Sequence, residues 1–420
     1  MFSSMANIFR VEELKNKVIF TLMMLVVFRF GIHIPVPGVD VGVIQRLFET
    51  GSLFGMLDLF SGGALSKFSL FAMSITPYIN SSIIMQLMTI AVPTLEQWNK
   101  EGAEGRKKIN QITRYGTVVI AFIQGFAMAY GLQAEGALLN PGITSVLMIA
   151  LTLTAGTVLL MWIGEQMTEK GIGNGISLII FCGIIARLPD GIGVLYEYAR
   201  TGAAGWLNIG LFVMIAIFVL VFIIAIQQGM RKIPVQYAKR QVGRKMYGGQ
   251  SSYLPLKVNQ AGVIPVIFAS SVLMFPPAVA QFIQIDWVQS VAQAFAWGTW
   301  LNMILYIVLI IFFTYFYTAV TFNVQEMSDN LKKYGGFIPG IRPGKPTSEY
   351  LDRVMSRITL GGAMFLAFVA ITPNIIGTAT GITGIYFGGT ALLIVVGVAL
   401  DTMKQIEAMV LMKHYQGFMK

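Results

Sequence analysis

The chain has 420 residues, of which 55% are hydrophobic and 12% are charged, and its formal net charge is +10. Soluble globular domains carry about 25% charged residues, so this composition excludes an ordinary soluble protein and indicates an integral membrane protein. The single cysteine, Cys182, excludes a disulfide framework and a cysteine-based metal site. In a membrane protein, a positive net charge more often reflects basic cytoplasmic loops than nucleic-acid binding.

The first apolar run, Val18 to Phe28, follows basic residues and taken alone is similar to a secretory signal peptide. No small-x-small cleavage site follows it, and Arg29 interrupts the run. We therefore expect a retained first helix.

Ten segments are long and apolar enough to predict membrane-spanning helices, since about 20 apolar residues cross the hydrocarbon core. They are residues 17–37, 73–92, 113–132, 144–165, 175–195, 208–227, 259–283, 297–321, 357–377 and 386–404.

The basic residues predict the orientation of these spans. Of the 30 Lys and Arg residues, 25 lie in the amino-terminal segment, the tail and the loops after spans 2, 4, 6 and 8. Such loops stay in the cytoplasm, so both termini are expected there. Ten spans divide into halves of five, residues 1–200 and 201–420. An odd number of spans per half implies that the halves are inverted, which usually places the working pathway between them.

Two cytoplasmic loops are longer than a connection requires, at about residues 228–258 and 322–356. The alternation in "KIPVQYAKR", followed by turn residues around Gly243, predicts a β-hairpin. In the second loop, "SEYLDRVMSR" predicts the start of a helix with Ser348 as its cap. Both loops are either topology signals alone or docking surfaces for a partner, and their length and internal structure favour docking.

Catalytic chemistry is not indicated. Two distant histidines, His33 and His414, and one cysteine in an apolar context do not build a nucleophilic triad, and "GIRPGKPT" lacks the spacing of a phosphate-binding loop. The span interiors are almost uncharged, with Arg29 and Asp401 expected at interfaces. Ion-coupled carriers usually need charged groups at mid-membrane. An inverted-repeat secondary transporter for a small solute, and a scaffold whose basic loops recruit ribosomes, remain the alternatives to a channel.

A short segment rich in Gly and Ser, about Leu57 to Phe71, precedes the second span. It is too short to cross a membrane. Irregular backbone at membrane depth is tolerated where it lines a cavity. The residues alone leave two interpretations open, a segment inside such a cavity and a re-entrant loop on the surface.

Several motifs resemble the bacterial SecY family, whose members form the central subunit of the protein-conducting channel. They are "MSITPYINSSIIMQL", "GEQMTEKGIGNGISLIIF", "KVNQAGVIPVIFASS", "DNLKKYGGFIPGIRPGKPT" and "YFGGTALLIVVGVALD". The resemblance implies an all-α polytopic protein of the bacterial inner membrane, with ten helices in two inverted halves and a re-entrant plug helix. It also implies a channel for unfolded secretory polypeptides and not an enzyme.

The resemblance further implies a pore ring of aliphatic side chains. By motif, the ring consists of Ile79, Ile83, Ile176, Ile180, Ile267 and Ile394. β-Branched side chains are stiff, and a narrow apolar collar blocks ions by dewetting. Spacing alone favours ordinary core packing over a pore ring.

The same resemblance makes residues 57–71 a plug on the outer side of the ring and implies a lateral gate that opens toward lipid. The plug residues are Ser61, Gly62, Gly63, Ala64, Leu65 and Ser66. The gate residues are Gln124, Asn259 and Gln86, although an ordinary hydrogen bond between helices is the simpler interpretation. Signal sequences would replace these contacts and partition into lipid.

The expected partners follow from the family. They are SecE, SecG, the SecA motor ATPase and the ribosome, with Arg244, Lys245, Arg342 and Gly344 as SecA or ribosome contacts. Basic loops gain a salt-sensitive attraction to polyanionic ribosomal RNA. No cofactor is implied, because SecA supplies the ATP chemistry.

Overall fold

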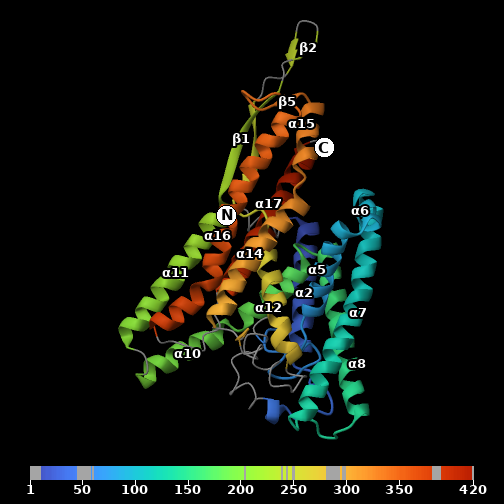
Figure 1. Ribbon diagram of the computed structural model, residues 1–420, viewed down its shortest axis with the longest axis vertical. Helices are drawn as coiled ribbons and strands as arrows, with labels where there is room; N and C mark the ends of the chain where they lie inside the picture. Colours follow the sequence, from blue (N-terminus) through green and yellow to red (C-terminus); the bar gives the residue numbers. More distant parts are fainter. Residues whose placement is uncertain are drawn as a thin grey trace.

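The chain folds mainly into long helices that run roughly along one axis (Figure 1). A small sheet lies at one end of this axis and the turn between α7 and α8 at the other. The computed structural model describes residues 11–44, 58, 61–202, 205–237, 240–242, 245–247, 251–280, 294–295, 299–380 and 389–418.

The amino-terminal part of the described chain is helical. Its helices are α2 (Glu12–Gly31), α5 (Thr76–Ala91), α6 (Pro93–Lys100), α7 (Ala103–Ala134), α8 (Ile143–Lys170), α9 (Gly175–Ala186) and α10 (Leu188–Thr201).

The carboxy-terminal part combines helices with short strands. Its helices are α11 (Trp206–Gln228), α12 (Ile264–Ala280), α14 (Trp300–Thr321), α15 (Val324–Lys333), α16 (Lys345–Thr380) and α17 (Gly389–Phe418). Its strands are β1 (Met230–Tyr237), β2 (Arg240–Val242), β3 (Lys245–Tyr247), β4 (Ser251–Lys257) and β5 (Gly336–Phe337).

Each of the ten expected spans contains a helix. By length and composition, seven helices of the described residues can cross a membrane, or eight if the bent pair α5 and α6 forms one span. The difference from ten has local causes. Helix α2 carries five charged residues along its length, and the apolar described part of α12, Ile264–Leu273, is short. The chain is thus a multi-pass membrane protein.

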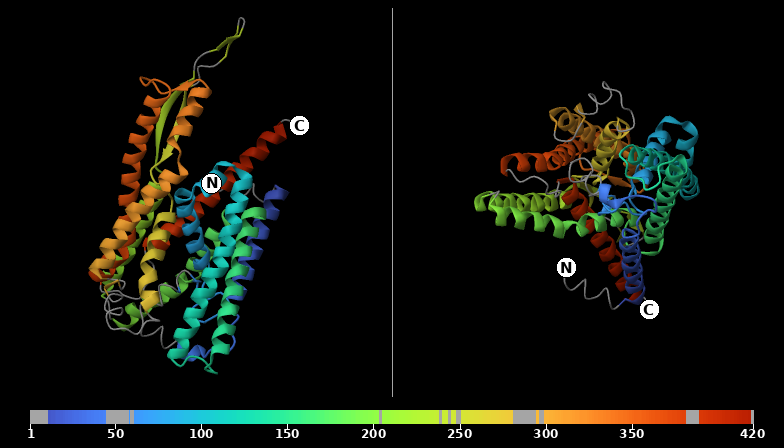
Figure 2. Two further views of the ribbon diagram at one scale, coloured as in Figure 1. Left: turned by 45° about the vertical axis from the view of Figure 1, so that its right-hand side comes forward. Right: turned by 90° about the horizontal axis from the view of Figure 1, so that it is seen from below.

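The helices form two neighbouring groups. In Figure 2, α2, α7 and α8 stand on one side and α12, α14 and α16 on the other. Helix α17 links the groups, because it packs against α11 and α16 as well as against α9. A second link is the packing of α5 against α12. The line between the groups is therefore crossed mainly by α5, α9, α12 and α17.

Local signals fix several helix ends. The side chain of Asn174 accepts hydrogen bonds from the Ile176 and Ser177 amides and caps α9. Asn323 caps α15 in the same way through the Glu326 amide. Pro93 follows the end of α5, and the axis turns by 99° into α6 there. These caps determine where the apolar helices enter and leave the bundle.

The predicted hairpin in residues 228–258 is confirmed. Strand β1 pairs antiparallel with β4, and β2 pairs antiparallel with β3 beyond them, so the hairpin projects from the helices (Figure 1). Strand β5 from the second long loop adds to the other edge of β1. The two long loops, residues 228–258 and 322–356, therefore form one structural unit, called here the loop unit.

The predicted cap at Ser348 is wrong. Helix α16 already begins at Lys345, and the Ser348 hydroxyl donates to Gln325 of α15. The earlier start has a physical reason. Gly344 adopts a left-handed φ of 100°, which turns the chain, and Pro346 has a φ preorganised for the first helical turn.

Candidate pore ring and plug

The six isoleucines expected to form a ring lie on four helices from both groups. Ile79 and Ile83 lie on α5, Ile176 and Ile180 on α9, and the other two on α12 and α17. Helical spacing of four places each pair on one face. The candidate ring therefore draws on the four helices that cross between the groups.

Five of these isoleucines meet at one buried apolar cluster, called here the central cluster. Ile180 and Ile394 belong to it, and Ile79, Ile176 and Ile267 pack against it. The sixth, Ile83, is buried in the neighbouring cluster of the carboxy-terminal helices, which Ile79 also contacts. The buried members of the central cluster are Phe28, Ile32, Ala64, Phe71, Ile75, Leu160, Ile163, Met167, Leu178, Ile179, Ile180, Ile184, Ala391, Ile394 and Val398.

Residues 61–75 lie inside the bundle and reach this cluster. Ser61 and Asp58 are helical, and the chain then continues in tight turns to α5. Ala64, Phe71 and Ile75 of this segment are buried members of the central cluster. A surface re-entrant loop would not bury them, so the segment occupies an interior position. The first residues of the expected plug, 57 and 59–60, lie outside the described residues.

The segment is held by close packing and by backbone bonds. Phe71 stacks on Phe28 of α2, with ring centroids 6.1 Å apart. The Leu70 amide donates to the Ile34 carbonyl, and Val36 donates back to the Phe68 carbonyl. Phe68 is buried at a φ of 41°, a conformation that costs on the order of 1–3 kcal/mol for a bulky residue. The surrounding contacts must compensate for this strain.

Asp58 organises the turn that follows it, residues 61–66, which is called here the plug turn. Its Oδ1 accepts hydrogen bonds from the Ser61 hydroxyl at 2.8 Å and from the Leu65 and Ser66 amides at 2.9 and 3.0 Å. Its Oδ2 forms an ion pair with Nη2 of Arg187 at 2.5 Å. The side chain is only 1% exposed. A buried carboxylate at the start of the expected plug therefore accepts hydrogen bonds through Oδ1 and forms an ion pair through Oδ2.

The turn also approaches α9 and α2 very closely. A Cβ added at Gly62 would lie 2.7 Å from the Gly183 Cα atom, and Gly62 has a φ of 67°. Arg29 of α2 donates from Nη1 to the Gly62 carbonyl at 3.1 Å. Only glycine satisfies both the contact and the backbone conformation at this position.

The expectation of an uncharged centre needs a correction. Asp58 and Arg187 form a charged pair inside the bundle, and Arg29 contacts the plug turn beside them. Sequence reasoning singled out neither Asp58 nor Arg187. A signal was present, because an acidic residue shortly before a Ser-Gly-Gly sequence is typical of a side chain that caps a turn.

The expected lateral-gate residues are only partly brought together. Gln86 lies on α5, which packs against α12, and Gln124 is half-buried on α7. Asn259 is buried and its amide donates to the Gly262 carbonyl at 3.0 Å. Within the described part of the chain, Asn259 Oδ1 and Gln86 Oε1 are buried without hydrogen-bond partners. No hydrogen bond joins Gln124 to Asn259 among these residues.

The expected contact residues for SecA or the ribosome lie at the sheet end. Lys245 lies on β3, and Arg342 is exposed in the turn before α16. Gly344 closes that turn, and its carbonyl accepts a hydrogen bond from Ser328. Arg244 lies outside the described residues.

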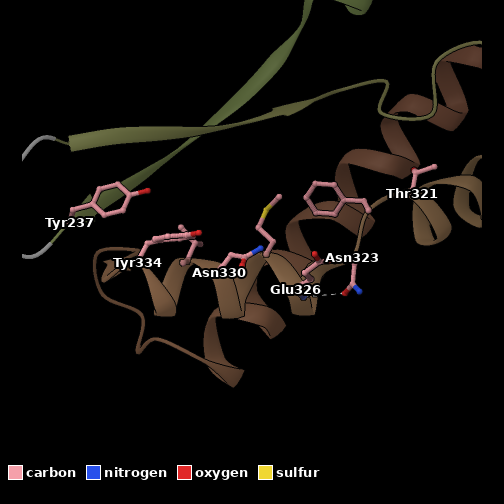
Figure 3. Close-up of a pocket in the computed structure, with 9 residues that line it drawn as sticks. Tyr237, Thr321, Asn323, Glu326, Asn330 and Tyr334 are labelled. Atoms are coloured by element: carbon pink, nitrogen blue, oxygen red, sulfur yellow. Dashed lines mark hydrogen bonds between the residues drawn. The ribbon is translucent and has the colours of Figure 1, made fainter. Parts of the chain in front are cut away.

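A hollow of about 460 Å³ lies between β1 and α15, as Figure 3 shows. Tyr237 borders it on the strand side, and Asn330 and Tyr334 border it on the helix side. The hollow belongs to the loop unit, away from the isoleucines, and we do not assign the pore to it. At the candidate ring, Ala64, Phe71 and Ile75 share the central cluster with the isoleucines.

A bundle of membrane-length helices whose two groups meet around a buried segment of tight turns defines a polytopic membrane protein. Comparison with known proteins agrees with this class. The SecY family model matches residues 69–403. The chain is 52% identical over 435 residues to the protein translocase subunit SecY of Halalkalibacterium halodurans, with full coverage of both. The chain belongs to the SecY family.

A second relative is the protein translocase subunit SecY of Escherichia coli strain K12. It is 46% identical over 418 residues, which cover 97% of this chain and 94% of the relative. The breadth of these matches favours the channel interpretation over a small-solute transporter.

Solved structures share the fold at low sequence identity. A structure described as a protein-conducting channel has a TM-score of 0.67 at 18% identity and covers 94% of this chain and 92% of its own. A SecY structure described for a plug domain that stabilises the closed state has a TM-score of 0.65 at 19% identity, with the same coverage. Sec61 in the canine ribosome-channel complex has a TM-score of 0.64 at 17% identity and covers 94% and 92%.

The contact between Gly62 and Gly183 predicts the reactivity of the only cysteine. Cys182 lies half-buried on α9 next to Gly183 and packs against the central cluster. Replacing Gly62 by Ala should push the turn away from α9 and raise the rate of Cys182 labelling severalfold. The measurement is mass spectrometry after brief exposure of the reconstituted protein to a maleimide. Gly193→Ala is the matched control, because a Cβ there meets nothing within 4 Å. Equal labelling of both variants would contradict the packing.

Proposed function

We propose that the chain forms a channel that carries unfolded secretory polypeptides across the membrane and releases apolar segments sideways into lipid. The chain is a channel subunit and not an enzyme. Its relatives are named protein translocase subunits. The single observation that carries the proposal is that the plug turn packs into the same apolar cluster as five of the six candidate ring isoleucines.

This arrangement suits a seal that must open for many different side chains. Isoleucine makes no specific hydrogen bonds, and its stiff side chain keeps a narrow collar in place. Such a collar excludes water and ions by dewetting. A polypeptide that displaces the plug would find apolar side chains able to deform around it. The collar and the plug, residues 61–66 and their neighbours, form two barriers in series.

Lateral release would open the contact between α5 and α12, which pack against α7 and α14 respectively. Gln86, Gln124 and Asn259 supply polar groups on α5, on α7 and before α12. Two of these groups present buried acceptors without partners, which costs stability in the closed state. An incoming apolar segment would replace the weak contacts and then partition into lipid by its own hydrophobicity.

The loop unit at the sheet end would dock partners on the cytoplasmic side. Arg244, Lys245 and Arg342 would contact the SecA motor ATPase or ribosomal RNA, with Gly344 shaping the turn. A related channel, Sec61, is described in a ribosome-channel complex. SecE would clamp the two inverted halves, residues 1–200 and 201–420, and SecG would join them. The distribution of Lys and Arg supports cytoplasmic termini in a bacterial inner membrane.

The ring assignment predicts a resting ion leak. Replacing Ile79, Ile83 and Ile180 together by serine should raise the leak through the reconstituted channel at least about tenfold, since a polar collar stays wet. The measurement is the current across a planar bilayer without substrate. Ile149→Ser is the control, because Ile149 is fully buried in another cluster. An unchanged current in the triple variant, or an equal rise in the control, would show that the ring lies elsewhere.

The docking assignment predicts a separable defect. Arg342→Glu should abolish most SecA-driven export, because it reverses an exposed charge at the loop unit, while membrane insertion of the chain stays normal. The assay follows ATP-dependent entry of a secretory precursor into vesicles. Lys333→Glu is the matched control on the same loop, also at an exposed position. Normal export by the Arg342 variant would leave the loop with a topological role only.

A further inference from the structure

We propose that Asp58 and Arg187 form a latch that holds the plug turn against the end of α9 in the closed channel. The inference rests on the proposed function and adds two positioning residues to it. Asp58 lies near the start of the expected plug, residues 57–71, and Arg187 lies between α9 and α10. Their ion pair joins the plug to the helix that also carries Ile176 and Ile180.

The two carboxylate oxygens of Asp58 have different partners. Oδ1 accepts hydrogen bonds from within the turn, from the Ser61 hydroxyl and the Leu65 and Ser66 amides. Oδ2 has Arg187 as its single polar partner within the described part of the chain. One oxygen therefore shapes the plug, and the other ties it to the rest of the protein.

Burial of Asp58 strengthens its dependence on the ion pair with Arg187. Asp58 is 1% exposed, whereas the Arg187 side chain is 23% exposed and keeps some contact with solvent. Loss of the cation would leave a charged, buried oxygen without a partner, which is strongly unfavourable. A plug that moves into water avoids this penalty, because water solvates the carboxylate. Removing Arg187 should therefore shift the plug outward and leave the helices in place.

Arg187 is well placed for the role. It ends α9, where its amide donates to the Ile184 carbonyl, and it begins α10. The close contact between Gly62 and Gly183 on the same helix brings the turn within reach of the guanidinium. Arg29 adds a weaker tie from α2 to the Gly62 carbonyl.

The test measures resting ion leak and global stability together. The chain is reconstituted with the channel subunits that copurify with it, as wild type, Arg187→Gln and Arg187→Lys. We expect Arg187→Gln to raise the leak at least about tenfold, which corresponds to about 1.4 kcal/mol in the open-to-closed ratio. Arg187→Lys keeps the charge and should leak less. The matched control is Arg200→Gln, an exposed arginine on α10, which should leave the leak unchanged.

Further variants test whether the orphaned Asp58 carboxylate and the displaced plug cause the leak. Asp58→Asn combined with Arg187→Gln removes the orphaned charge, so the pair should leak less than Arg187→Gln alone. Deletion of residues 61–66 should leak by itself, and adding Arg187→Gln to the deletion should have no further effect. If Arg187 only stabilised the fold, Arg187→Gln would instead lower the unfolding temperature. It would also increase the leak of the variant that lacks residues 61–66.

The outcomes separate the latch from the plug. A leak in the deletion without one in Arg187→Gln would overturn the latch and leave the proposed function intact. No leak in either would overturn the plug itself. If Arg187→Gln does not fold, the Asp58→Asn and Arg187→Gln pair decides, because it lacks the ion pair and should leak more than wild type. A leak equal to wild type in this pair would also count against the latch.

Discussion

The proposed seal depends on one constraint, that the polar groups of the turn at residues 61–66 need partners inside the bundle. No water is available in an apolar seal to hydrogen-bond an exposed amide or carboxylate. Asp58 meets much of this demand, because one oxygen satisfies two amides and a hydroxyl and the other pairs with Arg187. Irregular backbone can therefore lie beside the isoleucines without breaking the seal.

The same constraint explains why the proposed seal combines apolar packing with specific polar contacts. In the proposed channel, the isoleucines together with Phe28 and Phe71 would close the passage by apolar packing, which is not directional. The ion pair and the backbone bonds fix where the plug sits, which apolar packing alone does not specify. Phe68 lies within the same segment in a strained backbone conformation. In the proposed channel, a plug held by a few polar contacts would be displaced by a substrate.

The sequence predicted the helices well because the length that crosses a membrane is a local property. Alternation and turn residues likewise predicted the hairpin of β1 to β4. The cap at Ser348 failed because Gly344 and Pro346 start α16 earlier. The prediction that the six isoleucines lie near one another came from the resemblance to the SecY family and not from their spacing. The Asp58–Arg187 pair was missed because it joins residues far apart in the chain, and only the folded bundle brings them together.

The most direct test of the central claim is translocation into vesicles that contain this chain and SecE, with SecA, ATP and an unfolded secretory precursor added. The account predicts precursor that becomes protected from external protease only when ATP is present. A folded chain that binds SecA but protects no precursor would contradict the channel and favour a docking scaffold.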